Sequence, residues 1–463
     1  MSFSEKYSRL FSYLLPTPFT IALVLAIVTF FLGIVFSYQA NVSIIDQSIT
    51  VFSYFEKGVW NNGLMVFALQ MMLILVLGHA LALSKPFDQF IQFFVKSCTT
   101  TSKSAAIVAF LTILMAYFNW GLALIFGAIF ARKVGEAAQK NGIAINYPLI
   151  GAAGYVGLMV WHGGISGSSL TKVAESGHLK SLMVDLMPTS AIDLLPNSIT
   201  FSETVFSSIN ITASIAVLIA VPSGLYLVGK KVKEEKVTHL IISKETGKDN
   251  PAEGAESIDH SKWFGRLIGS LFILYSVYQG IKSYPDPGLG FINLNYINFF
   301  LFGLCLAFHE SIRDFLSAID EGIGGAAGIL IQFPIYFGIM GIMNSSGLIQ
   351  SFSDFFVSIS SETTFPIFSL ISAGIVNLFV PSGGGQWAVQ GPIIVQAAQE
   401  IGVSLPKSIL ALAYGDQLTN MLQPFWALPL LAVTKLKAQQ ILPYTLFLFL
   451  IGSVIYVSVL LIF

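Results

Sequence analysis

The sequence predicts an all-α polytopic membrane protein with about nine transmembrane helices and two re-entrant hairpins in an inverted repeat. Of its 463 residues, 54% are hydrophobic and 11% are charged, whereas a soluble chain carries about 25% charged residues. Apolar stretches of about 20 residues, the length that spans a bilayer, recur along the chain. Polar and glycine-rich breaks interrupt some of them, which is unusual for a buried helix.

Composition also excludes several classes of function. The formal net charge is −1 with no long basic block, so the sequence gives no sign of nucleic-acid binding. No glycine-rich phosphate loop of the Gly-x-x-x-x-Gly-Lys-Ser/Thr type is present, which argues against ATP-driven transport. Cys98 and Cys305 lack metal-ligand spacing and are expected to be packing residues. The first apolar segment lacks a clear cleavage site and is read as a retained span.

Nine segments have the length and composition of membrane spans. Lys6 and Arg9 precede the first one and place the N-terminus in the cytoplasm, because cytoplasmic loops retain positive charge. The predicted spans are 18–38, 62–84, 148–171, 209–229, 263–282, 295–310, 323–345, 407–434 and 441–463.

Two further apolar stretches are predicted to be re-entrant hairpins. Residues 104–131 lie between Lys103 and Arg132, and a crossing there would put one basic flank outside. Residues 363–399 contain no charge, which is too long for one span and short for two. The first hairpin would enter from the cytoplasm and the second from the outside.

The chain is expected to consist of two membrane halves, 1–229 and 263–463, joined by a cytoplasmic linker. The linker, 230–262, is the only long polar stretch and is expected to be flexible. Each half would contain one hairpin followed by one broken helix, at 148–171 and 407–434. The mixed region 173–208 fits an interfacial segment but cannot be assigned further.

A short internal repeat supports this division. VGEAAQKNGIAINYPLIGAAGY (134–155) aligns with IVQAAQEIGVSLPKSILALAYG (394–415), so that Gly142 corresponds to Gly402. Both copies follow a hairpin and precede a broken span, and the charge argument gives them opposite orientations. Inverted repeats of this kind are a common architecture of secondary transporters.

Four breaks are expected to meet at the middle of the membrane, two at hairpin tips and two in the broken helices. Non-helical backbone at that depth must be buried in protein or line a polar cavity. Glycines permit a tight reversal, and the second half-helix, expected to begin near Gln386, would direct its free N–H groups at the tip, as an anion site requires. The predicted substrate-binding residues are Asn119, Trp120, Gly121, His162, Gly164, Ser166, Gly167, Ser168, Ser382, Gly383, Gly384, Gly385, Gln386 and Trp387.

Two ionisable residues stand alone in apolar segments, Asp416 in the second broken helix and His162 in the first. A titratable group at membrane depth is costly and is therefore a functional hypothesis. Asp416 is predicted to bind Na⁺ or to carry a proton, and no other cofactor is expected. The predicted coupling-ion residues are Asp416, Gln417, Thr419, Asn420 and Gln423, because several oxygens at one locus suit a hard cation.

No arginine lies in the predicted site region, so helix termini and hydroxyls would bind the substrate. This set suits one carboxylate with a small apolar tail better than a dicarboxylate, for which bidentate arginine is common. His79, His309 and Glu310 lie in or near the ends of spans and are expected to be packing or interface residues.

Four stretches resemble the bacterial short-chain fatty acid transporter family: FNWGLALIFGAIFAR (118–132), WHGGISGSSL (161–170), VPSGGGQWAVQGPIIVQAAQ (380–399) and YGDQLTNMLQPFWALPLLA (414–432). The resemblance covers essentially the whole chain. It implies an inner-membrane carrier of small monocarboxylates such as acetoacetate or butyrate. By likeness to the larger ion-transporter group it also implies a scaffold part, a transport part with paired hairpins, an elevator-type movement and a homodimer.

Three alternatives stay open on the sequence alone. The chain could carry another organic anion, including an amino-acid conjugate. It could be a membrane-embedded serine enzyme that uses Ser166 or Ser168 with His162, although GISGS is not the Gly-x-Ser-x-Gly elbow of hydrolases. It could also be a passive channel, which conductance without substrate saturation would support.

Overall fold

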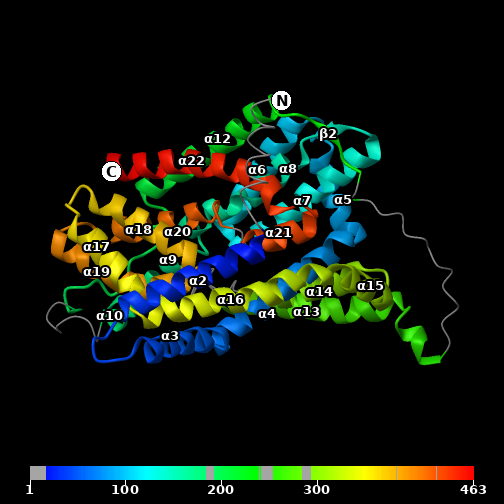
Figure 1. Ribbon diagram of the computed structural model, residues 1–463. Helices are drawn as coiled ribbons and strands as arrows, with labels where there is room; N and C mark the ends of the chain where they lie inside the picture. Colours follow the sequence, from blue (N-terminus) through cyan, green and yellow to red (C-terminus); the bar gives the residue numbers. More distant parts are fainter. Residues whose placement is uncertain are drawn as a thin grey trace.

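The structure is a computed structural model that describes residues 17–183, 192–238, 240, 254–283, 294–381, 383–423 and 425–463. In these residues the regular structure is helical apart from one two-stranded sheet (Figure 1). The predicted all-α class is therefore confirmed. Lys6 and Arg9, on which the predicted orientation depends, lie outside the described residues.

Helices in the first part of the chain begin at recognisable caps. Ser43, Asn61, Thr100 and Ser207 each accept a hydrogen bond from a backbone N–H in the first turn of the helix that follows. The elements are α2 (Pro18–Phe36), α3 (Ile44–Val59), α4 (Asn62–Leu83), α5 (Lys85–Val95), α6 (Thr101–Phe118), α7 (Trp120–Asn141), β1 (Ala144–Ile145), α8 (Tyr147–Tyr155), η1 (Val156–Met159), η2 (Trp161–Gly163), α9 (Ser168–Ala174), α10 (His178–Met183) and α12 (Ser208–Gly229).

The second part of the chain continues the pattern of long apolar helices and short amphipathic ones. Its elements are β2 (Glu235–Lys236), η3 (Gly254–Ile258), α13 (Lys262–Ser283), α14 (Leu294–Phe308), α15 (Ile312–Ile323), η5 (Gly324–Ala326), α16 (Ala327–Ser345), α17 (Leu348–Ser358), α18 (Phe365–Phe379), α19 (Gly383–Ile401), α20 (Leu405–Thr419), α21 (Ala427–Thr434) and α22 (Ala438–Ile462).

The helices form two groups that lie side by side (Figure 1). In one group, α16 packs on α2 and α3, while α14 packs on α4 and α13. In the other, α18 packs on α20, and α12 packs on α6 and α22. Both groups draw helices from both halves of the sequence. The spatial grouping therefore does not follow chain order.

Seven helical stretches in the described part of the chain are long and apolar enough to cross a membrane. Six of them coincide with predicted spans, and the seventh is α6, which the sequence assigns to a hairpin. The predicted span 295–310 forms a shorter apolar helix, and 407–434 is divided into α20 and α21. Because length and composition allow α6 to cross a membrane, the re-entrant course of 104–131 stays a prediction.

Four amphipathic helices, α3, α5, α15 and α17, were not predicted. Each is 11 to 16 residues long, too short or too polar for a span. α3 packs along α16 so closely that a Cβ on Gly341 would clash with the carbonyl oxygen of Tyr54. Amphipathic helices need this kind of tertiary support, which a search for apolar runs does not detect.

Each of the two stretches predicted to be a hairpin forms a pair of helices joined by a very short break. Asn119 separates α6 from α7, and three residues separate α18 from α19. The members of each pair contact one another. One boundary was wrong by a turn, since α19 begins at Gly383 and not near Gln386.

The two connectors after these pairs have the same local structure at the positions that the sequence aligned. Gly142 and Gly402 both adopt left-handed backbone conformations, with φ of 66° and 86°, which favour glycine. The next residues, Ile143 and Val403, donate backbone hydrogen bonds to Ala138 O and Ala398 O, at 2.9 and 2.8 Å. The two connectors therefore share one type of helix-ending turn, and the repeat and its orientation in a membrane stay predictions.

The first residues of the predicted linker are fixed to the first half. β2 pairs antiparallel with β1. The backbone N–H of Leu240 donates to Gln139 Oε1 at 2.9 Å, and the Leu240 side chain is buried. The first part of the predicted linker is therefore packed against the first half and does not form the flexible connector that was expected. In the region 173–208, Ile199 N donates to Val173 O, and residues 184–191 lie outside the described part.

Candidate functional site

The first hairpin tip and the first broken helix are joined by backbone contacts. Ile165 N donates to Tyr117 O at 2.9 Å, and Trp120 N donates to Ser166 Oγ at 3.1 Å. A Cβ on Gly164 would lie 2.6 Å from Tyr117 O, so only glycine permits this approach. Asn119 caps α7 by accepting from Leu122 N at 3.1 Å. The start of α7 is thus satisfied by protein groups.

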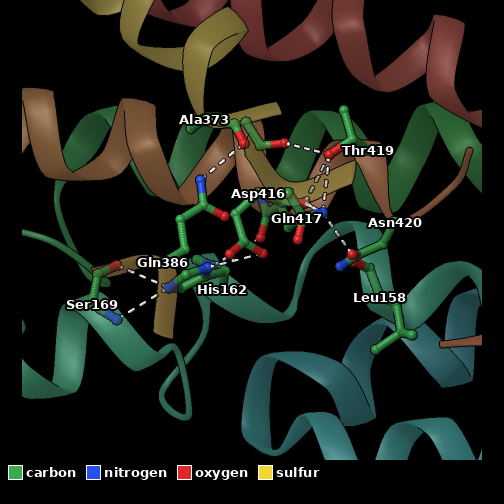
Figure 2. A network of polar contacts seen from close by, with 12 residues as sticks. Leu158, His162, Ser169, Ala373, Gln386, Asp416, Gln417, Thr419 and Asn420 are labelled. Atoms are coloured by element: carbon green, nitrogen blue, oxygen red, sulfur yellow. Dashed lines mark hydrogen bonds and ion pairs between the residues drawn. The ribbon is translucent and has the colours of Figure 1, made fainter. Parts of the chain in front are cut away.

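The two broken helices cross-link one another. Gly163 N donates to Gln417 Oε1 at 3.0 Å, and Asn420 Nδ2 donates to Leu158 O at 3.0 Å. The Tyr155 hydroxyl donates to Asn420 O at 2.9 Å. All of these groups are buried, so the two breaks satisfy each other's polar atoms where no water would do so (Figure 2).

His162 and Asp416 form a buried pair at the centre of the site (Figure 2). His162 Nδ1 lies 3.4 Å from Asp416 Oδ1, and the two side chains are 0% and 1% exposed. His162 Nε2 accepts the backbone N–H of Ser169 at 3.1 Å, and the Ser169 hydroxyl lies 2.9 Å from the same atom. Because a backbone N–H can only donate, Nε2 carries no proton and the imidazole proton is on Nδ1, towards Asp416.

Asp416 is only partly satisfied. Its Oδ2 has no hydrogen-bond partner in the described residues, and neither does His162 Nδ1, whose contact with Oδ1 is poorly aligned. A buried carboxylate oxygen without a donor is a position at which a cation would find a ligand. The pair therefore carries a net charge of −1 when Asp416 is ionised and zero when a proton or another monovalent cation joins it.

Asn377 of α18 organises the second break, and the sequence reasoning missed it. Its Nδ2 donates to Asp416 O at 2.7 Å and lies 3.0 Å from Thr419 Oγ1 and 2.9 Å from Asn420 Oδ1. Gln423 Nε2 donates to Asn420 Oδ1 as well, at 3.0 Å. The five predicted coupling-ion residues, Asp416, Gln417, Thr419, Asn420 and Gln423, are thus brought together, but Asp416, Gln417 and Thr419 lie in the last turns of α20 and not in the break.

Several buried oxygens near this cluster accept no hydrogen bond from the described residues. They are Asn377 Oδ1, Gln386 Oε1, Asp416 Oδ2 and Gln423 Oε1. Carboxylate and amide oxygens are the ligands that hard monovalent and divalent cations prefer. The described residues contain no group of three His, Cys, Asp or Glu side chains that could hold a metal ion. Any cation bound here would rely on amide and backbone oxygens around one carboxylate.

The first turn of α19 faces the first broken helix. A Cβ on Gly383 would lie 2.7 Å from Trp161 Cη2 and 3.0 Å from His162 Cε1. A Cβ on Gly384 would meet only Ser168 Oγ, at 4.0 Å. Trp161 is 4% exposed, and its indole N–H finds no partner in the described residues. The benzene edge of a buried indole thus lies against the start of α19, and helix N-termini are where anions bind.

Buried amide side chains also connect α18 and α19. Gln386 Nε2 donates to Ala373 O and Gln390 Oε1, both at 2.8 Å, and Gln390 Nε2 donates to Ser372 Oγ at 2.9 Å. Gln390 was not predicted. Gln386 thus lies in the interior between α18 and α19, with its carbonyl oxygen left without a donor.

The other predicted substrate residues differ in where they lie. Trp387 Nε1 donates to His178 Nε2 at 3.0 Å, so its indole is already paired with α10. Gly167 and Ser168 form the start of α9, and Gly121 packs near Ile74. Ser382 lies outside the described residues, and Gly385 lies in the first turn of α19.

Asn210 and Tyr414 are further residues that the sequence reasoning missed. Tyr414 donates to Asn210 Oδ1 at 2.9 Å, and Asn210 Nδ2 donates to Gly163 O at 2.8 Å. Together they hold the turn next to His162. A neutral amide inside an apolar segment, such as Asn210 or Asn377, is the signal that could have identified both.

A family model described as "Short chain fatty acid transporter" matches residues 2–463 of this chain. The chain belongs to the short chain fatty acid transporter family. It is 32% identical over 464 residues to the "Putative short-chain fatty acid transporter" of Escherichia coli (strain K12), covering 98% of each protein. It is also 32% identical over 440 residues to the protein of the same name in Haemophilus influenzae, covering 93% of this chain and 92% of that protein. The predicted family is confirmed.

Two solved transporter structures are similar to the chain. MtrF of Neisseria gonorrhoeae gives a TM-score of 0.42 at 12% identity, covering 99% of this chain and 97% of MtrF. The YdaH transporter of Alcanivorax borkumensis gives a TM-score of 0.41 at 16% identity, covering 95% of this chain and 97% of YdaH.

Membership of a transporter family excludes the serine-enzyme alternative. The geometry also differs from that hypothesis, because His162 contacts Ser169 and not Ser166 or Ser168. Ser166 accepts from Trp120 N. The order Ser169, His162, Asp416 matches that of a hydrolase triad. In a chain of this family, the same connectivity fixes the tautomer of a buried histidine.

Proposed function

We propose that the protein is a secondary active carrier that moves a short-chain fatty acid together with one cation. The observation that carries the proposal is the buried pair of His162 and Asp416 beside the first turn of α19. The family supplies the substrate class, a small monocarboxylate such as acetoacetate or butyrate. The site supplies a chemical reason for coupling.

The substrate carboxylate would bind at the first turn of α19. Backbone N–H groups of Gly383 and Gly384 would donate to it, with the positive end of the helix dipole behind them. Trp161 contacts this turn through Cη2 of its ring, and its Nε1–H is a buried donor that has no partner in the described residues. The start of α7 is a weaker candidate, because Asn119 and Ser166 already accept two of its N–H groups.

Coupling would follow from charge. An ionised Asp416 and a bound carboxylate would place two negative charges in one buried site, and their repulsion is strong at low dielectric. A proton on Asp416, or Na⁺ beside it, removes one of these charges. Substrate and cation would therefore bind together, and neither would bind well alone. Gln417, Thr419, Asn420 and Gln423 would complete a Na⁺ site, whereas a transported proton would be held between Asp416 and His162.

Alternating access would use the two groups of helices. The group with α18 and α20 would move as a transport part against the group with α14 and α16, in an elevator-type movement. In this proposal 104–131 and 363–399 are re-entrant hairpins, and the chain has nine spans in two inverted halves. It would reside in the inner membrane as a homodimer with a cytoplasmic N-terminus. The alternative is that the same site accepts another organic anion. The test below distinguishes this alternative by whether butyrate is taken up.

The test is uptake of labelled butyrate into liposomes that contain the purified protein. Na⁺ and pH gradients are imposed separately, with protein-free liposomes as the baseline because butyric acid leaks through bilayers. Saturable uptake driven by one gradient, lost in Asp416→Asn and kept in Asp46→Asn, is the expected result. Asp46 is exposed on α3 and provides the same chemical change away from the site.

Absence of uptake above the baseline under both gradients would contradict short-chain fatty acid transport and direct the search to larger organic anions. Uptake that both substitutions leave unchanged would contradict the role of Asp416 alone. The gradient that drives uptake identifies the coupling ion.

A further inference from the structure

Trp161 lies at the junction between a polar cluster and a series of aromatic rings. Its ring stacks on His162, with centroids 4.5 Å apart and an interplanar angle of 16°. It also lies 5.8 Å from the ring of Trp120 at the first hairpin tip. His162 leads to Asp416 and the buried amides, whereas Trp120 leads to a second aromatic ring, that of Trp426.

The aromatic series continues from Trp120 to Trp426, whose rings meet edge to face at 5.2 Å. Trp426 in turn lies 6.0 Å from Phe67 of α4 and 5.1 Å from Phe425. Phe425 stacks on Phe333 of α16 at 4.1 Å. The series therefore begins at the proposed carboxylate site and ends on the neighbouring group of helices.

The far end of this series is closed and rigid. Phe333 and Phe425 are 0% and 1% exposed, and Trp426 is 4% exposed. Protein interiors packed at this density resist the insertion of even one extra methylene. Trp120 is only partly buried, so its ring is the accessible part of the series. Its backbone is fixed by the bond from Trp120 N to Ser166 Oγ.

A fatty acid bound by its carboxylate at α19 has two directions for its tail. Towards His162 and Asp416 it would cover buried polar atoms that already lack partners, which is costly. Towards Trp120 it would meet the aromatic rings of Trp161, Trp120 and Trp426. The hydrophobic effect therefore favours the second direction.

We propose that Trp120 and Trp426 determine the chain length of the substrate, with Trp120 as the surface along which the acyl tail lies and Trp426 as its end stop. This inference rests on the proposed function, because it assumes that the carboxylate binds beside Trp161. Neither residue need contact the carboxylate or the coupling cation. Trp426 was not among the residues predicted from the sequence.

The experiment compares fatty acids of four and six carbons in a binding assay on the purified full-length protein, which avoids leakage through membranes. Dissociation constants for butyrate and hexanoate are measured for the wild-type protein, Trp426→Ala, Trp426→Phe and the control Trp263→Ala. Trp263 is 79% exposed on α13, so the control removes an indole at an exposed surface away from the proposed site. Trp426→Phe opens less space and keeps an aromatic ring, in case the alanine variant does not fold.

We expect the wild-type protein to bind butyrate more tightly than hexanoate. Removing the end stop shifts the ratio of the two constants towards hexanoate by about tenfold, the lower range of discrimination per methylene in an apolar pocket. Trp426→Phe shifts it in the same direction by less. Trp263→Ala leaves the ratio unchanged.

A general packing role of Trp426 would weaken both acids together and leave the ratio constant, and that outcome overturns the inference while the proposed function stands. A wild-type protein that binds neither acid overturns the proposed function itself. A shift of the ratio towards hexanoate in either Trp426 variant supports the end stop.

Discussion

The two copies of the repeat have matching connectors but opposite chemistry at their breaks. Gly142 and Gly402 turn the chain in the same way, and both copies continue into a helix with proline in its first turn. The first copy then contributes a base, His162, in a stretch of short 3-10 turns. The second contributes an acid, Asp416, near the end of a regular helix. A duplicated scaffold thus holds a site that neither copy could form alone.

The difference extends to the two hairpin tips. The start of α7 donates to Asn119 and Ser166, which belong to its own copy. The start of α19 lies against Trp161, His162 and Ser168, which belong to the other copy. The start of α7 is therefore bonded within its own copy, whereas the start of α19 lies against the first broken helix, where we place the substrate.

The largest effect is expected for the pair of His162 and Asp416, which joins the two copies. Substituting His162→Ala or Asp416→Ala alone lowers gradient-driven butyrate uptake by about 100-fold, because each leaves its partner buried without compensation. The double variant loses little more, since groups that act as a unit are not additive. Uptake rates in proteoliposomes measure the cycle. Losses that multiply would show that the acid and the base act independently.

A smaller loss is expected when the amide that organises the second break is removed. Asn377→Ala leaves Asp416 O, Thr419 and Asn420 without a shared donor, which costs about 3 kcal/mol in a buried network. We expect the apparent melting temperature in detergent to fall by roughly 5 °C. Asn197→Ala, at an exposed amide, is the matched control. Equal melting temperatures for the two variants would contradict this role.

The contrast between the tips can be sharpened with two neighbouring glycines. Gly383→Ala places a methyl group against Trp161 and His162, whereas Gly384→Ala has ordinary space near Ser168. We expect the first to raise KM for butyrate uptake about tenfold and the second to raise it by about threefold or less. Equal effects of the two substitutions would place the carboxylate elsewhere than at this turn.

The smallest effect is a pH dependence at the edge of the second tip. Burial lowers the pKa of His178 from its ordinary value of 6.5, with an opposing effect of Glu175 and a further lowering by Lys172. The unfolded chain therefore takes up the proton first as the pH falls. The stability that neutral His178 gives by accepting from Trp387 is complete above about pH 6.5 and is lost as the pH falls through the lowered pKa.

Melting curves between pH 7.5 and pH 5 measure this contribution. We expect the wild-type protein to lose about 2 °C over that range from this group, and His178→Gln to lose correspondingly less. Identical pH dependence in both proteins would show that the contact with Trp387 does not depend on protonation.

The sequence predicted the long apolar helices and the isolated charged residues within them. Long apolar runs identified most of the helices, and an isolated charge in such a run identified Asp416 and His162. It did not predict α3 or α15, because amphipathic helices resemble ordinary polar sequence until a neighbour covers one face. Asn377 and Asn210 escaped attention because a neutral amide carries no charge to mark it.

The sequence also did not predict which way side chains near the helix ends point. Trp387 lies within one turn of the glycines at the start of α19, yet its indole pairs with His178. Trp426 lies two residues beyond a predicted polar break and joins Trp120 across the repeat. Nearness along the chain places a residue at a helix end, but the helix rotation and the partner side chains decide which way it points.

The bonds between the two breaks have a consequence for chimeric proteins. Gly163 with Gln417, Leu158 with Asn420, and His162 with Asp416 each join one half of the chain to the other. Gln417 and Asn420 bind backbone groups of the first half, which any residue supplies, whereas His162 and Asp416 must both be present as side chains. A chimera that takes its two halves from different relatives must therefore keep the His162–Asp416 pair and the backbone course around Leu158 and Gly163.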